Sequence, residues 1–327
     1  MKALIPVAGF GKRLRPHTLV HPKVLLPVAG KPMLEHIIDQ LVRDGIDDIV
    51  LIVGHLGENI EEHLKKRYDI PLQFVKQENP LGLGHAIHSA REAVEPGEPL
   101  MIVLGDTLYD ADLKAVSQGP HTSLGIKEVE NPRRFGVAVL DEHGFISKLV
   151  EKPQEPVSKL ALVGIYYIKN STILFDALQE IIDKNIKTKN EYQLTDGLQL
   201  MIDKGEKMTV FNVEGWYDCG KIETILETNR ILLEKQISPP PAYACNSIII
   251  PPCFIHPEAK IYTSIIGPNV SISKETVIEK SILEHTIIGE NSEIKFTHIT
   301  HSLIGNNVKL KGKFNRITLG DFSEHEI

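Results

Sequence analysis

The feature that most constrains the fold is a phrase that occurs three times near the C-terminal end. Residues 264–272 read SIIGPNVSI, residues 286–294 read TIIGENSEI and residues 302–310 read SLIGNNVKL. Apolar residues also recur six positions apart, as at Ile266 and Ile272. A period of six with an I-G-x-N turn is typical of a parallel β-helix, in which each coil buries its apolar side chains against the next coil. We therefore predict a small solenoid in this part of the chain.

A glycine loop follows the first apolar run at the other end of the chain. Residues 3–7 are apolar, Gly9 and Gly11 come next, and the cations Arg13 and Lys23 follow them. Glycine lacks a Cβ atom, so backbone N–H groups in such a loop can approach an anion closely. Arg13 offers a planar fork to phosphate oxygens, and Lys23 offers a point charge. The loop therefore suits a polyphosphate.

Two common phosphate-binding loops are excluded by the spacing. The pattern G-x-x-x-x-G-K-[ST] of a P-loop does not occur here, and Leu14 stands where a G-x-G-x-x-G loop needs its third glycine. A P-loop nucleotide site and a dinucleotide site are therefore both disfavoured for this segment.

Apolar runs of strand length alternate with segments of helical spacing through the first two thirds of the chain. The helices are predicted over residues 32–42, 58–68, 171–182 and 222–235, and the strands over residues 49–55, 72–75, 100–104 and 163–166. Such alternation favours an α/β fold with a mainly parallel, Rossmann-like sheet flanked by helices, whose ligands bind beyond the carboxyl ends of the strands. Three further runs, residues 123–129, 136–140 and 146–150, predict a meander that forms an inserted or ligand-facing sheet.

A proline-rich stretch separates the two patterns. Residues 238–241 read SPPP, which cannot continue a helix and predicts a stiff linker. A chain of 327 residues is also long enough for two domains. We predict an α/β domain over residues 1–237 and a β-helix domain over residues 238–327.

The composition excludes several classes of partner and site. The net charge of −7 gives no global basic field for nucleic acid, so cations must be concentrated locally. The three cysteines lack CxxC spacing, which argues against a disulfide framework. The first residues read as a strand and not as an export signal, and apolar runs are too short to span a membrane. We therefore expect a cytoplasmic protein with neither nucleic acid nor membrane as a partner.

The glycine loop and the segment after it resemble a known family. The motif G-x-G-x-R-L-x-P-x-T, followed by PK-x-LLPV-x-x-KP, runs unbroken from Gly9 to Pro32 and resembles the signature of the sugar-phosphate nucleotidyltransferases. That family includes glucose-1-phosphate thymidylyltransferase and UTP–glucose-1-phosphate uridylyltransferase. Similar motifs follow in the family's order: EKP at residues 151–153, E-x-Q-[IL]-TD at residues 191–196 and W-x-D-x-G at residues 216–220.

The resemblance implies an activity and a cofactor. A pyrimidine nucleotide, dTTP or UTP, would react with a sugar 1-phosphate, most simply glucose 1-phosphate, to give an NDP-sugar and pyrophosphate with the help of Mg²⁺. The repeats resemble the left-handed β-helix tails of longer relatives, which commonly assemble subunits, so a homo-oligomer is expected. The base, the sugar and the number of subunits stay open, because thymine and uracil differ by one methyl group.

The resemblance also assigns roles to residues of this chain. Gln77 has an amide that can match the edge of uracil or thymine, and Asp106, at the carboxyl end of a strand, suits Mg²⁺, which takes few carboxylates. The nucleotide-binding residues are Ala8, Gly9, Gly11, Gln77 and Gly82. The catalytic residues are Arg13, Lys23 and Lys152. The sugar-binding residues are Gly136, Glu151, Lys152, Gly164, Tyr166 and Glu191. The metal ligands are Asp106 and Asp218.

Each motif taken alone also has a purely structural interpretation. The Gly82 segment alone would be a hinge before a helix, and the Asp106 side chain could cap the next segment. His85 fits a role in holding the start of that helix at least as well as a ligand contact, and Tyr166 fits core packing. Lys221 departs from the family, which often has Thr after the glycine of W-x-D-x-G.

Two other functions compete with nucleotidyl transfer. One is a bifunctional enzyme that adds acyl-CoA transfer on the β-helix. Four histidines are scattered through the β-helix and could serve as a base, but positions at coil corners or on the surface explain them better. They are His256, His285, His298 and His301. The other is a non-catalytic nucleotide-binding regulatory or scaffold protein. Loss of Arg13, Lys23 or either aspartate would have favoured that reading, but all four are present.

Overall fold

A computed structural model describes residues 1–235 and 244–313. The chain divides into two compact units: residues 1–26 with residues 31–224, and residues 27–30 with the chain from residue 225 onward. The predicted linker at residues 238–241 and the predicted boundary at residue 237 lie outside the described residues. The helix α7, Ile222–Lys235, begins in the first unit and continues in the second.

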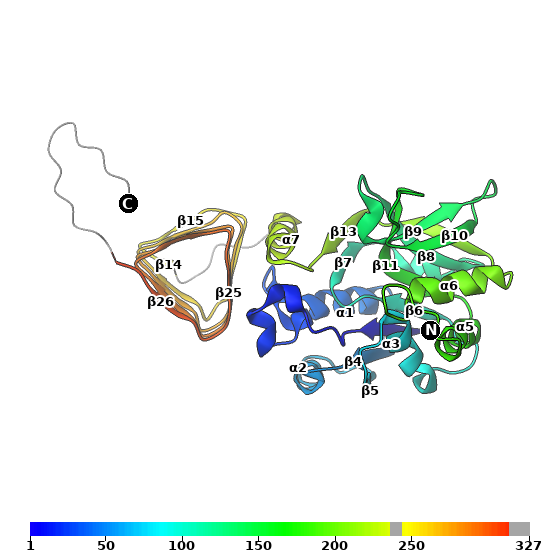
Figure 1. Ribbon diagram of the computed structural model, residues 1–327. Helices are drawn as coiled ribbons and strands as arrows, with labels where there is room; N and C mark the ends of the chain where they lie inside the picture. The colour runs from blue at the N-terminus through cyan, green and yellow to red at the C-terminus, as the bar shows by residue number, and fades with distance from the viewer. Residues whose placement is uncertain (236–243, 314–327) are drawn as a thin grey trace. The chain divides into compact units, whose positions relative to one another are not determined.

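Parallel strands form one half of the main sheet in the first unit (Figure 1). Their order is β6-β1-β4-β5, and every residue of β4 is buried, as expected for a strand covered on both faces. The strands are β1, Lys2–Pro6; β4, Ile49–Val53; β5, Leu72–Lys76; and β6, Leu100–Val103. The connecting helices are α1, Met33–Arg43; α2, Gly57–Arg67; and α3, Leu83–Ser89. This half confirms the Rossmann-like prediction.

The other half of the same sheet is largely antiparallel. Strand β11 pairs antiparallel with β6, β8 and β9, while β12 pairs parallel with β8. The predicted strands are present, but the meander is wrong, because β11 separates β8 from β9 and all three belong to the main sheet. The strands are β8, Thr122–Glu128; β9, Gly136–Leu140; β10, Ile146–Glu151; β11, Leu160–Ile168; and β12, Met208–Asn212.

Smaller elements complete the first unit. A two-stranded ribbon joins β7, Thr107–Asp110, to β13, Gly215–Asp218. The remaining α-helices are α4, Leu113–Ser117; α5, Ser171–Asp183; and α6, Leu194–Asp203. Short turns of 3-10 helix lie at Lys12–Leu14, His17–Leu19, Lys23–Leu25, Arg91–Ala93 and Pro132–Arg134, and β3 is Lys31–Pro32.

The second unit contains the predicted β-helix. Three parallel sheets make the faces of a triangle, which Figure 1 views end-on. Ile261 pairs with Ile278, and Ile294 with Leu310, so one coil takes 17 residues and a later one 16. This is the left-handed parallel β-helix that the resemblance implies. Its first sheet holds β14, Ala244–Cys245; β17, Lys260–Tyr262; β20, Val277–Glu279; β23, Glu293–Lys295; and β26, Lys309–Lys311.

The other two sheets are shorter. One holds β15, Ile248–Ile249; β18, Ile265–Ile266; β21, Ile282–Glu284; and β24, His298–Thr300. The third holds β16, Cys253–Ile255; β19, Val270–Ile272; β22, Ile287–Ile288; and β25, Leu303–Ile304. The unit also includes β2, Pro27–Val28. His285 and His301 have left-handed backbones, with φ of 45° and 48°, and stack on each other, which agrees with the coil-corner reading.

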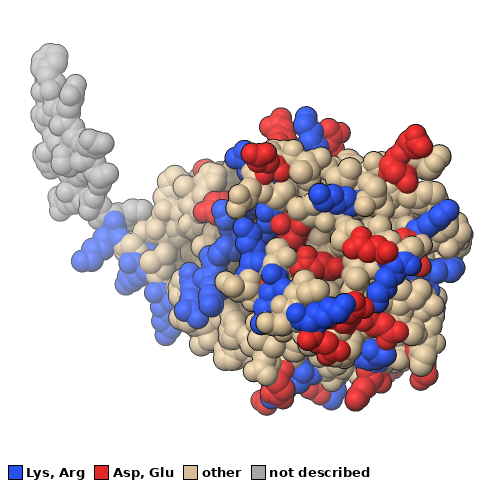
Figure 2. All heavy atoms as spheres, turned by 45° about the vertical axis from the view of Figure 1, so that its right-hand side comes forward, with Lys and Arg blue, Asp and Glu red and all other residues tan. Residues whose placement is uncertain are grey.

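Surface charge and hydropathy agree with the composition. The face in Figure 2 carries acidic and basic side chains together, so the described residues of this face form no uniformly basic surface. Among the described residues, no helix is both long and apolar enough to cross a bilayer.

Candidate active site

The glycine loop after β1 is held by one buried threonine. Thr18, which is 6% exposed, donates its hydroxyl to the backbone carbonyl of Gly11 at 2.9 Å. Gly11 has a φ of +59°, and a Cβ there would lie 2.9 Å from the Thr18 methyl group. Leu14 is fully buried while Arg13 is exposed. Buried anchors thus fix the loop and leave its cations available to a ligand.

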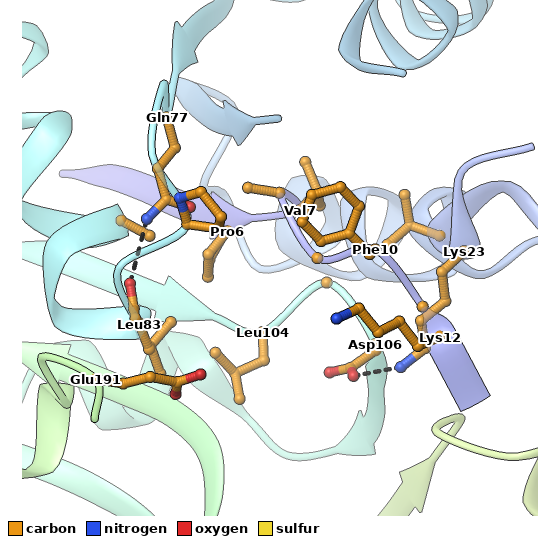
Figure 3. A pocket seen from close by; sticks show the side chains of 18 residues that line it. Pro6, Val7, Phe10, Lys12, Lys23, Gln77, Leu83, Leu104, Asp106 and Glu191 are labelled. Carbon is orange, nitrogen blue, oxygen red and sulfur yellow. Dashed lines mark hydrogen bonds and ion pairs between the residues drawn. The ribbon is translucent and has the colours of Figure 1, made fainter. Parts of the chain in front are cut away.

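A first cavity of about 520 Å³ lies over the carboxyl end of β1 (Figure 3). It contains every residue predicted to bind the nucleotide, together with Lys23, Asp106 and Glu191. Those nucleotide residues are Ala8, Gly9, Gly11, Gln77 and Gly82. A Cβ at Gly9 would meet nothing within 4 Å, so the loop has open space beside its backbone.

A second cavity of about 670 Å³ contains the residues predicted to bind the sugar. Arg13 lines this cavity and is missing from the lining of the first. Asp106 and Glu191 line both cavities, as do two leucines, Leu83 and Leu104. The predicted residues that line the second cavity are Arg13, Asp106, Gly136, Glu151, Lys152, Gly164, Tyr166, Glu191 and Asp218.

The two predicted metal ligands come from paired segments. Asp218 is opposite Thr107 in the β13–β7 ribbon, and the backbone N–H of Cys219 donates to the carbonyl of Asp106 at 3.1 Å. A Cβ at Gly220 would lie 2.8 Å from Oδ1 of Asp218 and 3.1 Å from Nη2 of Arg13, so only glycine leaves these groups together. The ribbon therefore brings both carboxylates and one guanidinium to the second cavity.

These carboxylates fit a magnesium ion better than a protein-only metal cage. Within residues 1–235 and 244–313, no group of three or more His, Cys, Asp or Glu side chains could hold a metal. Mg²⁺ typically takes one or two carboxylates and completes its shell with water and substrate phosphates. Asp106 and Asp218 supply that number of hard oxygen ligands at one cavity.

On the sugar side, Glu151 is held by a network. Thr195 donates its hydroxyl to Oε2 of Glu151 at 2.7 Å, and Nζ of Lys152 lies 2.9 Å from Oε1. Burial raises the pKa of Tyr166, and the negative charge of Glu151 raises it further. The Tyr166 hydroxyl thus stays protonated, and the Glu151 carboxylate is fixed as a hydrogen-bond acceptor at the cavity wall.

Two of the singled-out glycines are required by packing. Gly82 has a φ of +121°, and a Cβ there would lie 2.5 Å from the carbonyl oxygen of Tyr192. Gly164 has a φ of +88°, and a Cβ there would lie 2.6 Å from Cδ1 of Leu104. A larger residue at Gly82 would have to move the backbone at Tyr192, and one at Gly164 would have to move the side chain of Leu104.

Sequence reasoning missed several cavity residues. Thr195 belongs to the quoted motif at residues 191–196, so the sequence could have marked it as a site residue, but not as the partner of Glu151. Arg133 and Arg134, which also line the second cavity, had a signal too, since they lie just before Gly136 in the sequence. The leucines that line both cavities gave no signal, because a leucine at a strand end or helix start reads as core.

Two relatives are similar to this chain over most of its length. A glucose-1-phosphate thymidylyltransferase of Streptomyces griseus is 30% identical over 359 residues, covering 100% of this chain and 99% of that protein. A bifunctional protein GlmU of Methanocaldococcus jannaschii is 34% identical over 326 residues, covering 95% of this chain and 74% of that protein.

A solved structure and a family description agree with these relatives. A UDP-glucose pyrophosphorylase complexed with UDP-glucose superposes with a TM-score of 0.62 at 27% identity, covering 72% of this chain and 99% of that chain. Residues 2–235 match the family described as nucleotidyl transferase. The chain therefore belongs to the nucleotidyl transferase family.

Proposed function

We propose that this protein transfers the nucleotidyl group of dTTP or UTP to glucose 1-phosphate and releases pyrophosphate. The observation that carries the proposal is the pair of cavities that share Asp106 and Glu191. One cavity adjoins the glycine loop and Gln77, and the other adjoins Glu151 and Lys152. A nucleotide in the first and a sugar phosphate in the second would meet beside Asp106.

The reaction needs no protein nucleophile. A phosphate oxygen of the sugar 1-phosphate is already ionised at neutral pH and attacks the α-phosphorus in line with the departing pyrophosphate. A P–O bond forms to the sugar phosphate while the bond to the β-phosphate oxygen breaks. The protein therefore contributes positioning and charge neutralisation.

Three cations divide this work. Arg13 holds the β and γ phosphates that leave as pyrophosphate, because its planar fork matches phosphate oxygens. Lys23 and Lys152 bracket the α-phosphate and the sugar phosphate. Glu151 accepts hydrogen bonds from sugar hydroxyls, and its ion pair with Lys152 keeps the two groups side by side.

We further propose that the metal is Mg²⁺, since members of the family generally depend on a divalent metal. Asp106 and Asp218 would hold the ion at the second cavity. When bound, Mg²⁺ neutralises phosphate charge that develops during transfer. The sequence-based expectations of a homo-oligomer assembled through the β-helix and of a cytoplasmic location stay predictions.

Acyl transfer on the β-helix stays an alternative to this proposal. The Streptomyces relative is matched along the whole of this chain and is named for a single activity, while the match to the bifunctional relative leaves about a quarter of that protein uncovered. This comparison favours nucleotidyl transfer alone.

The test is pyrophosphate release in the presence of Mg²⁺. Each of dTTP, UTP, CTP, GTP and ATP is offered with glucose 1-phosphate, and then with glucosamine 1-phosphate and mannose 1-phosphate. We expect a signal with glucose 1-phosphate confined to dTTP, UTP or both. Silence across the whole grid from a folded protein would contradict the proposal.

A further inference from the structure

Gln77, at the end of β5, presents only one side of its amide to the first cavity. Its side chain is nearly buried, at 8% exposed, and lines that cavity. Nε2 donates to the backbone carbonyl of Gly82 at 3.2 Å, the bond drawn in Figure 3. Because a carbonyl oxygen can only accept a hydrogen bond, the side of the amide that faces Gly82 must be the NH₂ group.

The second hydrogen of that NH₂ group is directed to His85 on α3. Nδ1 of His85 lies 3.2 Å from Nε2 of Gln77. Nδ1 accepts only in a neutral imidazole that carries its proton on Nε2. Burial lowers the pKa of His85, which favours the neutral ring. The ring also stacks on Tyr192, with centroids 6.4 Å apart and planes 26° apart, so its position is fixed.

The backbone just before His85 is held as well. The N–H of Gly84 donates to the carbonyl of Tyr192 at 2.8 Å, and the N–H of Tyr192 donates to the carbonyl of Leu81 at 2.9 Å. The loop and the helix start are therefore tied to the segment around Tyr192. His85 is outside the lining of the first cavity, so it acts on that cavity only through Gln77.

With both hydrogens of Nε2 engaged, Oε1 is the atom that Gln77 offers to a ligand. Among residues 1–235 and 244–313, no donor is recorded for Oε1. An acceptor at this place matches a base that carries N–H at N3. Uracil and thymine carry that hydrogen, whereas N3 of cytosine is itself an acceptor.

We propose that His85 is a positioning residue that fixes the amide orientation of Gln77, so that the first cavity selects uracil or thymine over cytosine. This inference rests on the proposed function, because it takes the first cavity as the base site. It deepens that function by naming the chemical edge that the base must present.

The experiment compares UTP with CTP in the full-length protein. Binding is measured by calorimetry with Mg²⁺ and without a sugar phosphate, and kcat/KM is measured with the sugar phosphate that the wild type uses. His85→Phe keeps a flat ring but removes the acceptor. His85→Asn offers Oδ1 near the position of Nδ1. His88→Phe, one turn further along α3, is the matched control, since His88 is outside the cavity lining.

We expect the wild type to favour UTP, and His85→Phe to reduce the UTP-to-CTP preference about five- to tenfold, the value of one hydrogen bond. His85→Asn should restore the preference, and His88→Phe should leave it unchanged. An unchanged preference in His85→Phe, or equal weakening of UTP and CTP, would overturn the inference. So would a loss that His85→Asn fails to restore, since packing alone would then explain it.

The two proposals fail separately. A wild type that binds UTP in preference to CTP but releases no pyrophosphate with any sugar phosphate contradicts the proposed function, while the binding preferences still decide the role of His85. A wild type that turns over UTP and CTP equally contradicts the inference and leaves nucleotidyl transfer standing.

Discussion

Nζ of Lys23 lies 2.5 Å from Oδ2 of Asp106, which joins the predicted phosphate-binding cation to a predicted metal ligand. The Lys23 side chain is only 10% exposed, so this pair is shielded from water more than a surface pair would be. Each group is the counterion of the other when no ligand is bound. Nucleotide and metal would have to separate the pair, turning Lys23 to phosphate and Asp106 to the ion.

Removing the Lys23 charge and removing the Asp106 charge should shift the affinity for a metal ion in opposite directions. Lys23→Met removes the cation that competes for Asp106, so Mn²⁺, used as a spectroscopic substitute for Mg²⁺, should bind the nucleotide-free protein more tightly. Asp106→Asn should bind Mn²⁺ more weakly. Both variants should lose turnover, by about 100-fold or more, because each removes a charge from the transferring phosphates.

The control for that prediction is Lys12→Met. Lys12 lines the first cavity, and its Nζ lies over the ring of Phe10, 5.9 Å from the ring centroid. Within residues 1–235 and 244–313 no carboxylate pairs with Lys12, whereas Lys23 pairs with Asp106. Lys12→Met removes one positive charge, as Lys23→Met does, but leaves Asp106 paired with Lys23. Equal Mn²⁺ affinity in Lys23→Met and the wild type would contradict the exchange of partners.

Gly82→Ala should weaken nucleotide binding through the backbone. A Cβ at Gly82 would meet the Tyr192 carbonyl at 2.5 Å in addition to the strain of a φ of +121°. Gly144→Ala is the matched control, because Gly144 has a φ of +81° and nothing within 4 Å. Gly144→Ala should lower the free energy of unfolding by about 1–2 kcal/mol from backbone strain alone. Gly82→Ala should lower it by more than this and should also weaken the binding of UTP. Chemical denaturation and calorimetry measure the two effects, and equal costs in both variants would argue against the Tyr192 contact.

The motifs located the candidate site from the sequence because its residues follow strand ends. Gln77 follows β5 and Asp106 follows β6. Because the carboxyl ends of parallel strands lie at one edge of the sheet, these two residues can be predicted to lie at the same edge even when the loop conformations are not known. The meander failed for a different reason. Strands β8 and β9 are adjacent in sequence with a turn between them, which suggests that they pair. In the structure, β11 lies between them and pairs with both, and local sequence does not show this long-range pairing.

Other features could not be found from local pattern. Thr195 meets Glu151 across 44 positions of sequence, and the contact depends on where α6 packs. The coil from Ile278 to Ile294 has 16 residues and not the 18 of three six-residue repeats, because the apolar spacing shortens to five twice, from Ile278 to Leu283 and from Leu283 to Ile288. The glycines gave a signal of close approach, but the sequence did not show that the backbone of Tyr192 packs against Gly82.

Acid should weaken a buried ion pair between α1 and α2. Glu35 is 7% exposed, with Oε1 2.7 Å from Nε2 of His63 and Oε2 3.3 Å from Nε of Arg67. Burial raises the pKa of Glu35, but its bonds to His63 and Arg67 outweigh that effect and lower the pKa below its ordinary value of 4.5. A lowered folded pKa adds stability above the unfolded pKa, and this stability is lost as the pH falls through the folded pKa.

Glu35→Gln tests this dependence. The variant should be less stable than the wild type at neutral pH, and the difference should shrink as the pH falls from about 4.5 into the range in which Glu35 takes up a proton. Urea midpoints across that range measure the difference. Glu62→Gln is the control, because Glu62 pairs with Lys66 in the solvent and should change stability little at any pH. A constant gap between Glu35→Gln and the wild type would contradict the prediction.

Within the second unit, Asn229 of α7 is a buried polar connection that the sequence did not reveal. It is fully buried, and Oδ1 accepts from the N–H of Ala29 at 2.9 Å and from the hydroxyl of Ser271 at 2.6 Å. Nδ2 donates to the carbonyl of Asn269 at 3.2 Å. One side chain therefore ties residues 27–30 and the β-helix coil to the helix.

Asn229→Ala should destabilise this unit, because three buried partners lose their bond at once. The expected cost is at least about 2–4 kcal/mol of unfolding free energy, since each buried polar group left unpaired costs about 1–3 kcal/mol. Ser271→Ala should cost less, because Oδ1 of Asn229 still accepts from Ala29. In the double variant the costs should fall short of additive by about 1 kcal/mol, which a double-mutant cycle in urea measures. Full additivity would mean that Ser271 and Asn229 do not interact, and would contradict the prediction.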